Sequence, residues 1–214
     1  MIIRIKKPKG QDIVFWISYA LFLIFGILST SFYYKYFIGT PYSMIKYFCI
    51  GLLFFRELSI GKYSIQSFLT GLMFVALVLI TRSQASVSTV AFILIYIFCA
   101  RNVEFEDIAW FSIWISSITM VFIIVSAQLG IIQDYIYSNV ARVRHYLGFR
   151  YALFGPTFLF NITGLVLYVK KAKIKWIELS VLVAINWWMF VMTNSRLSFL
   201  SVGLDGFRIW SIEG

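Results

Sequence analysis

Charged residues are scarce in this sequence. They make up 13% of its 214 residues, whereas a typical soluble domain has about 25%. Apolar residues make up 61%, which is more than one soluble core could hide from water, and no polar stretch is long enough to form a separate soluble domain. The shortage of charge therefore excludes an ordinary soluble domain and favours a membrane protein.

Cysteine and histidine are also rare. The two cysteines, Cys49 and Cys99, lie inside apolar segments without metal-ligand spacing, so we interpret them as packing residues. His145 is the only histidine. We therefore expect neither a metal site nor a cofactor.

Long apolar runs are abundant. Runs of about 18 residues recur, and a helix of about 20 apolar residues can cross a bilayer. The sequence predicts an all-α, multi-pass transmembrane protein that forms a single integral membrane domain over residues 1–214, with about seven spans and a partial eighth. The predicted spans are 13–31, 42–58, 65–81, 87–100, 108–127, 151–168 and 176–192, followed by the partial span 197–204.

The net charge is +10. We interpret it as a topology signal rather than a nucleic-acid site, because the basic residues occupy short segments beside apolar runs. A basic arm, residues 1–12, and a basic loop, residues 170–175, are then cytoplasmic, and the loop 128–150 is outside. The eleven basic residues predicted inside are Arg4, Lys6, Lys7, Lys9, Arg56, Lys62, Arg101, Lys170, Lys171, Lys173 and Lys175. The seven predicted outside are Lys35, Lys46, Arg82, Arg142, Arg144, Arg150 and Arg196.

The outer arginines need a reason other than topology. Each guanidinium can form two parallel hydrogen bonds to a phosphate or carboxylate. A group of arginines at a membrane surface therefore suits a lipid diphosphate. The alternative for any single arginine is an anchor to lipid head groups. The residues that we assign to substrate binding are Arg142, Arg144, Arg150, Ser195 and Arg196.

Two residues are candidates for a catalytic base. His145 can act near neutral pH, although a lone histidine in a loop is more often merely solvated. Asp134 is the only carboxylate predicted on the outer face. Both candidates stay open.

Polar residues inside the predicted spans have structural interpretations. We expect Asn161 and Asn186 to form hydrogen bonds between helices. Arg56 lies near the end of the second predicted span and is expected to extend outward to the membrane surface.

A family resemblance extends this interpretation. The segment Arg144-His-Tyr-Leu-Gly-Phe-Arg150 before a span, the lysine-rich turn, and Thr193-Asn-Ser-Arg196 after the next span resemble bacterial polysaccharide polymerases of the Wzy type. These are also called oligosaccharide repeat-unit or O-antigen polymerases. By position, Arg144 and Arg196 match the family's diphosphate-holding arginines. Family members usually have more spans, and capsule-type members often continue Leu-Gly-Phe with a His-Pro-Asn-like element, which is Arg150-Tyr-Ala here.

The resemblance implies an enzyme in the bacterial cytoplasmic membrane. It would join polyprenyl-diphosphate-linked oligosaccharides into capsular, exo- or O-antigen polysaccharide on the outer face, with other polysaccharide export proteins as partners. The apolar run after Arg196 is too short to span, so we expect the chain to be the N-terminal part of such an enzyme, with little activity alone. The alternative is a non-catalytic transporter or flippase of lipid-linked sugars.

Overall fold

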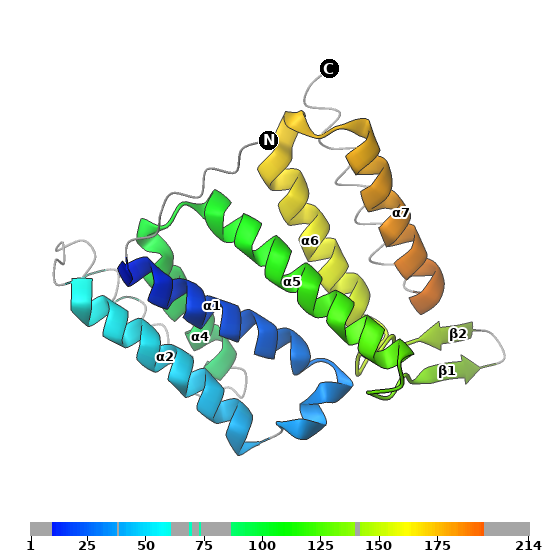
Figure 1. Ribbon diagram of the computed structural model, residues 1–214, viewed down its shortest axis with the longest axis horizontal. Helices are drawn as coiled ribbons and strands as arrows, with labels where there is room; N and C mark the ends of the chain where they lie inside the picture. Colours follow the sequence, from blue (N-terminus) through cyan, green and yellow to red (C-terminus); the bar gives the residue numbers. More distant parts are fainter. Residues whose placement is uncertain are drawn as a thin grey trace. The chain divides into compact units, whose positions relative to one another are not determined.

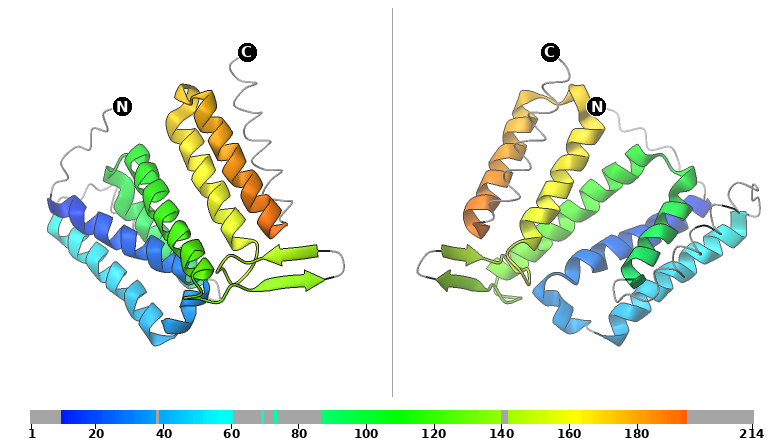
Figure 2. Two further views of the ribbon diagram at one scale, coloured as in Figure 1. Left: turned by 45° about the vertical axis from the view of Figure 1, so that its right-hand side comes forward. Right: turned by 180° about the vertical axis from the view of Figure 1, so that it is seen from behind.

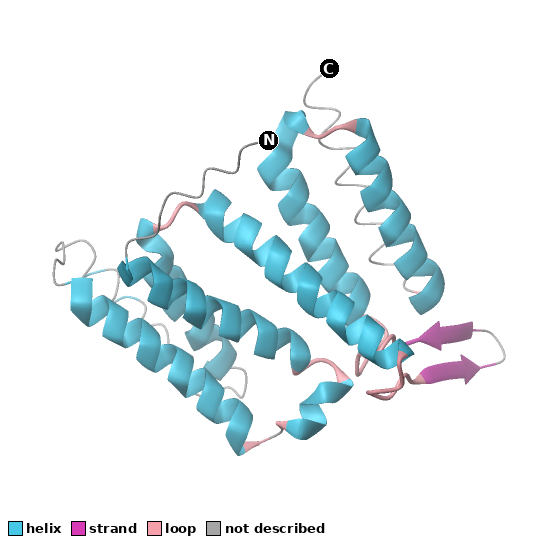
Figure 3. Cartoon of the chain, in the orientation of Figure 1, coloured by secondary structure: helices cyan, strands magenta, loops and turns pink. Residues whose placement is uncertain are grey.

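The computed structural model describes residues 10–37, 39–60, 87–139 and 142–194, together with Leu69 and Met73. This part of the chain is mostly helical, as predicted (Figure 1; Figure 3). Its elements are α1 (Gly10–Leu28), η1 (Phe32–Tyr36), α2 (Thr40–Ile60), α4 (Val87–Cys99), η2 (Ala100–Asn102), α5 (Phe105–Gln128), β1 (Ile136–Asn139), β2 (Arg142–His145), α6 (Phe154–Lys170), η3 (Lys171–Lys173) and α7 (Trp176–Thr193).

Two of the described helices are long and apolar enough to cross a bilayer. They are α5, with 24 residues, and α7, with 18 residues. The apolar part of α1 is limited to Ile13–Leu28, and α4 and α6 have 13 and 17 residues. Seven spans therefore stay a prediction. Except for Leu69 and Met73, the predicted spans 65–81 and 197–204 lie outside the described residues.

The connection between α6 and α7 is short and is stabilised by an ion pair. Glu178 in the first turn of α7 forms an ion pair with Lys170 at the end of α6. The same carboxylate accepts a hydrogen bond from the backbone N–H of Lys175 at 3.2 Å. A carboxylate at a helix start and a lysine at a helix end both complement the helix dipole. The short η3 connection returns the chain, so that α6 and α7 run antiparallel (Figure 2).

The chain divides into two compact units. The first comprises Met1–Phe22 and Gly39–Glu104, and the second comprises Leu23–Ile38 and Phe105–Gly214. Helix α1 contributes its first part to one unit and its last residues to the other.

The first unit is built from α1, α2 and α4 around a buried polar contact. The hydroxyl of Ser18 lies 2.8 Å from the hydroxyl of Tyr96 and donates to the carbonyl of Cys49 at 3.1 Å. Because these residues come from three helices, the contact ties the helices together. Cys49 and Cys99 are both buried free thiols, as expected for packing residues.

The second unit has an apolar core between α5, α6 and α7 that includes Ile123 and Met189. The side-chain amide of Asn186 donates to Thr163 Oγ1 at 3.0 Å and so joins α7 to α6. The predicted interhelical role of Asn186 is therefore confirmed. The prediction for Asn161 is wrong, because its side chain is exposed and makes no such bond within the described part of the chain.

A β-hairpin lies within the predicted 128–150 loop (Figure 1). Strands β1 and β2 are antiparallel, with Ile136 opposite His145 and Tyr137 opposite Arg144. Isoleucine, tyrosine and valine in these strands favour extended backbone. The sequence predicts a loop here, because the segment lies between two apolar spans and carries three arginines and the only histidine.

Candidate anion-binding site

The hairpin separates two neighbouring candidate residues. Successive strand residues point to opposite faces of a sheet, and residues paired across two strands share a face. Arg144 therefore shares a face with Tyr137, whereas His145 shares the other face with Ile136. Residues that are adjacent in the sequence are thus directed to different surroundings.

A buried segment anchors the base of the hairpin. Leu147 and Gly148 both have positive φ angles, 51° and 81°. A Cβ atom added to Gly148 would lie 2.9 Å from the side chains of both Ala127 and Ile132. Glycine is therefore required for its backbone conformation and for its lack of a side chain. This close approach holds the hairpin against the end of α5.

Phe149 connects that anchor to the other two helices. Its side chain is fully buried, and its ring lies so close to Gly155 in α6 that an added Cβ there would be 3.3 Å away. The same Cβ would be 3.5 Å from the sulfur of Met189 in α7. Phe149 therefore packs where the start of α6 meets α7, and it fixes the position of Arg150, the next residue.

Backbone hydrogen bonds join this segment to η1. The N–H of Phe32 donates to the carbonyl of Gly148 at 3.0 Å, and the N–H of Arg150 donates to the carbonyl of Thr30 at 2.8 Å. The guanidinium of Arg150 lies over the ring of Tyr34, 4.0 Å from its centroid. Arg150 is thereby held at both its backbone and its side chain.

The charged groups near the hairpin have open hydrogen-bonding capacity. The side chains of Arg144 and Arg150 form no hydrogen bond and no ion pair with any described residue. Asp134 is exposed in the segment between α5 and β1, and it too forms no ion pair with a described residue. The guanidinium N–H donors of these arginines are therefore available to an anion.

The remaining predicted residues lie at the edges of the described structure. Arg142 is the first residue of β2. Helix α7 contacts β2 and ends at Thr193, and the C-cap residue Asn194 has a left-handed φ of 50°. Figure 2 shows this end of α7 beside the hairpin in both views. Ser195 and Arg196 follow Asn194 and lie outside the described residues.

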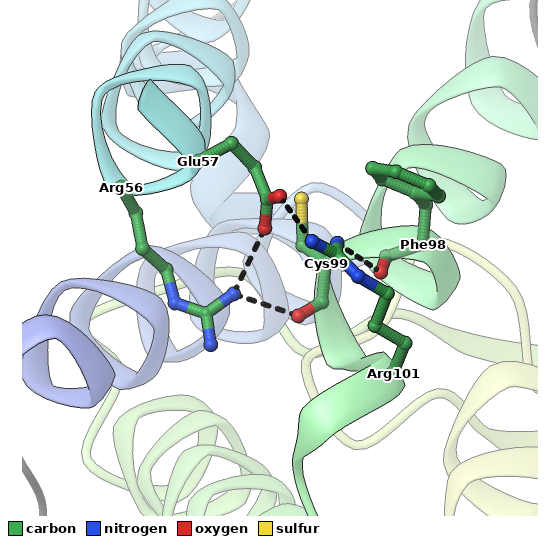
Figure 4. Close-up of polar contacts among 5 residues, drawn as sticks. All are labelled: Arg56, Glu57, Phe98, Cys99 and Arg101. Carbon is green, nitrogen blue, oxygen red and sulfur yellow. Dashed lines mark hydrogen bonds and ion pairs between the residues drawn. The ribbon is translucent and has the colours of Figure 1, made fainter. Parts of the chain in front are cut away.

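A buried charged cluster in the first unit was not anticipated (Figure 4). Arg56 is only 2% exposed and donates to the carbonyl of Cys99 at 2.7 Å and to Glu57 at 3.2 Å. Arg101 donates to the other carboxylate oxygen of Glu57 at 2.7 Å and to the carbonyl of Phe98 at 3.0 Å. One carboxylate therefore binds two guanidinium groups.

This cluster caps the C-terminal end of α4. The last carbonyls of a helix lack intrahelical partners, and the two arginines supply hydrogen bonds and positive charge at that point. The expectation that Arg56 extends outward is wrong, because Glu57 and the Cys99 carbonyl satisfy it inside the unit. An adjacent Arg-Glu pair inside an apolar segment was the available sequence signal.

Comparisons of the chain with protein-family models, with curated proteins and with solved structures find no match. Within the described residues, no three side chains of His, Cys, Asp or Glu lie close enough together to hold a metal ion. Arg144 and Arg150 carry positive charge and have no acidic partner among the described residues.

Proposed function

We propose that the chain is a membrane glycosyl polymerase that joins polyprenyl-diphosphate-linked oligosaccharides on the outer face of the bacterial cytoplasmic membrane. The bond between the growing glycan and its diphosphate carrier breaks, and a hydroxyl of the next lipid-linked unit forms the new glycosidic bond. The hydroxyl proton passes to a base, and polyprenyl diphosphate leaves.

The proposal is carried by the unneutralised arginines of the second unit. Arg144 and Arg150 have no acidic partner among the described residues, and both adjoin an anchored backbone. Negative charge develops on the diphosphate as the glycan leaves. Positioned guanidinium groups stabilise such charge without having to reorganise.

The arrangement of α6 and α7 supports the addition of a third arginine, Arg196, to the proposed site. The short η3 connection makes these helices antiparallel, and the end of α7 lies beside β2 (Figure 1). Arg196 follows Asn194 by two residues. This neighbourhood supports the proposed pairing of Arg144 and Arg196 on one diphosphate.

The exposed faces of the two helices that could cross a bilayer, α5 and α7, support a membrane location. On α5, the exposed apolar residues Trp114, Ile118, Val121 and Val125 recur at helical spacing along one face. Helix α7 has a similar exposed face that includes Ile177 and Val181. Exposing such continuous apolar faces to water is unfavourable, whereas lipid chains would cover them.

The base is proposed to be His145 or Asp134. Such a base acts on the acceptor hydroxyl, whereas the arginines act on the leaving diphosphate. The placement of His145 on the strand face away from Arg144 is compatible with these two tasks. Asp134, in the exposed segment before β1, is equally compatible.

The test is polymer formation by Arg144→Lys and Arg196→Lys in the full-length protein, in a polymerase-deficient host and at matched membrane levels. Lysine keeps the positive charge but cannot form the bidentate hydrogen bonds of arginine. Alanine at either position removes charge-assisted bonds of about 1.5–3 kcal/mol, or about 10- to 150-fold in rate. Lys173→Ala in the basic α6–α7 connection is the matched control and should leave polymer unchanged.

Wild-type polymer from both lysine variants would rule out the diphosphate clamp. Reconstitution of the full-length wild-type protein with lipid-linked repeat units distinguishes the polymerase from the alternative function. A polymerase lengthens the glycan, whereas a transporter or flippase only moves the units across the bilayer.

A further inference from the structure

The short helix η1 belongs to the second unit, where side-chain hydrogen bonds fix its N-terminal end. Ser31 is fully buried, and its hydroxyl accepts a hydrogen bond from the N–H of Tyr33 at 3.2 Å and donates to the carbonyl of Leu28 at 2.8 Å. The hydroxyl of Tyr33 donates to Ser126 in α5 at 2.9 Å. These bonds join η1 to Leu28 at the end of α1 and to Ser126 in α5.

Tyr34 differs from an ordinary aromatic residue at a membrane interface. The Arg150 guanidinium covers its ring at 4.0 Å. By contrast, the side chain of Tyr36 in the same helix is 73% exposed, as expected of a residue that contacts lipid head groups. The two tyrosines, although only two positions apart, therefore have separate environments.

An aromatic ring beneath a guanidinium limits the orientation of the guanidinium but does not occupy its N–H donors. Cation–π attraction acts on the face of the group, whereas the N–H donors lie in its plane. The backbone bond from Arg150 to Thr30, at 2.8 Å, holds the other end of the arginine. Arg150 is thus oriented and charged, and the described part of the chain provides it with no acidic partner.

We propose that Tyr34 orients Arg150 to bind one phosphate of the diphosphate, so that η1 forms one side of the anion-binding site. Tyr34 is a positioning residue that acts through Arg150. This inference rests on the proposed function, because it assigns a role within the same diphosphate site. The site would then include η1, which precedes Arg150 by more than a hundred residues in the sequence.

The experiment measures binding of farnesyl diphosphate to the full chain in nanodiscs of phosphatidylcholine, which carries no net charge. Tyr34→Leu should weaken binding by about 5- to 30-fold, the range expected for the loss of a cation–π contact. Tyr34→Phe keeps the ring and should stay near wild type. Tyr36→Leu is the matched control and should leave binding unchanged.

A double variant tests whether Tyr34 acts through Arg150. Tyr34→Leu should add little to the effect of Arg150→Ala, because residues that act as a unit are not additive. Fluorinated phenylalanines at position 34 serve if Tyr34→Leu does not fold. They weaken the negative ring face while largely keeping its shape, and affinity should fall as fluorine atoms are added.

The possible outcomes separate the inference from the proposed function. Failure of the wild-type chain to bind farnesyl diphosphate would count against the diphosphate site as a whole. Wild-type binding that is unaffected by Tyr34→Leu would overturn only the role of Tyr34. So would an equal loss in Tyr36→Leu, additive effects in the double variant, or indifference to fluorination.

Discussion

The two units hold their arginines in opposite ways. In the first unit, Arg56 and Arg101 share the carboxylate of Glu57 and also bind carbonyls at the end of α4. In the second unit, Arg144 and Arg150 have no such partner among the described residues. The same side chain therefore serves as a helix cap in one unit and has free donors in the other.

This difference distinguishes structural arginines from candidate ligand-binding arginines. A buried charge is tolerated when it is paired and hydrogen-bonded, and the donors used in that way cannot also bind a substrate. A guanidinium without an acidic partner keeps both its charge and its donors. Burial and pairing, rather than the number of arginines, therefore indicate where an anion would bind.

The largest expected effect comes from breaking the paired cluster. Glu57→Leu leaves two guanidinium groups without their shared carboxylate, and loss of one partner of a buried ion pair costs about 3–5 kcal/mol. We expect a correspondingly large fall in the free energy of unfolding, measured by denaturant titration in detergent micelles. Glu178→Gln breaks the more exposed pair with Lys170 and should have a much smaller effect. Similar losses in both variants would contradict the structural role assigned to Glu57.

The next effect concerns the support of the unpaired arginines. Gly148→Ala adds left-handed backbone strain of about 1–2 kcal/mol and overpacking of about 1–3 kcal/mol against Ala127 and Ile132. We expect a lower unfolding free energy and a loss of polymer formation.

Gly130→Ala is the control for Gly148→Ala. Gly130 also has a positive φ, but an added Cβ there meets no atom within 4 Å, so only the strain of about 1–2 kcal/mol applies. Equal losses of stability in the two alanine variants would show that close packing at Gly148 is unimportant.

The smallest effect tests whether the second unit depends on polar contacts between its helices. Asn186→Ala removes the 3.0 Å hydrogen bond to Thr163, and such bonds between membrane helices average about 0.6 kcal/mol. Asn161→Ala removes an exposed amide and should change the unfolding free energy less. A loss in Asn186→Ala as large as that in Glu57→Leu would remove the contrast between the units.

Some of the fold follows from local sequence patterns. The predicted segment 176–192 matches α7 within a residue, and 108–127 matches α5 within three. Apolar runs of that length leave few alternatives to a helix. The hairpin was missed because its apolar residues are interrupted by arginines and by His145, so that a local pattern did not distinguish a strand from a polar loop.

Sequence patterns predict only part of the candidate site. The Arg144–Arg150 segment was recognised from its charge, and its Leu-Gly-Phe centre was recognised only as a motif. The structure gives that centre a physical role, since Gly148 packs against α5 and Phe149 against α6 and α7. Strand alternation, rather than sequence distance, places Arg144 and His145 on opposite faces.

The apolar helices, the shortage of charge and the arginines between apolar segments follow from local sequence. Which of these arginines are paired follows from how distant segments pack. Arg101 meets Glu57 across 44 positions, and Arg150 meets Tyr34 from a still more distant segment. Hydrogen bonds and ion pairs act over a few ångströms, so only the packing of distant segments decides whether a guanidinium is neutralised or left open to a ligand.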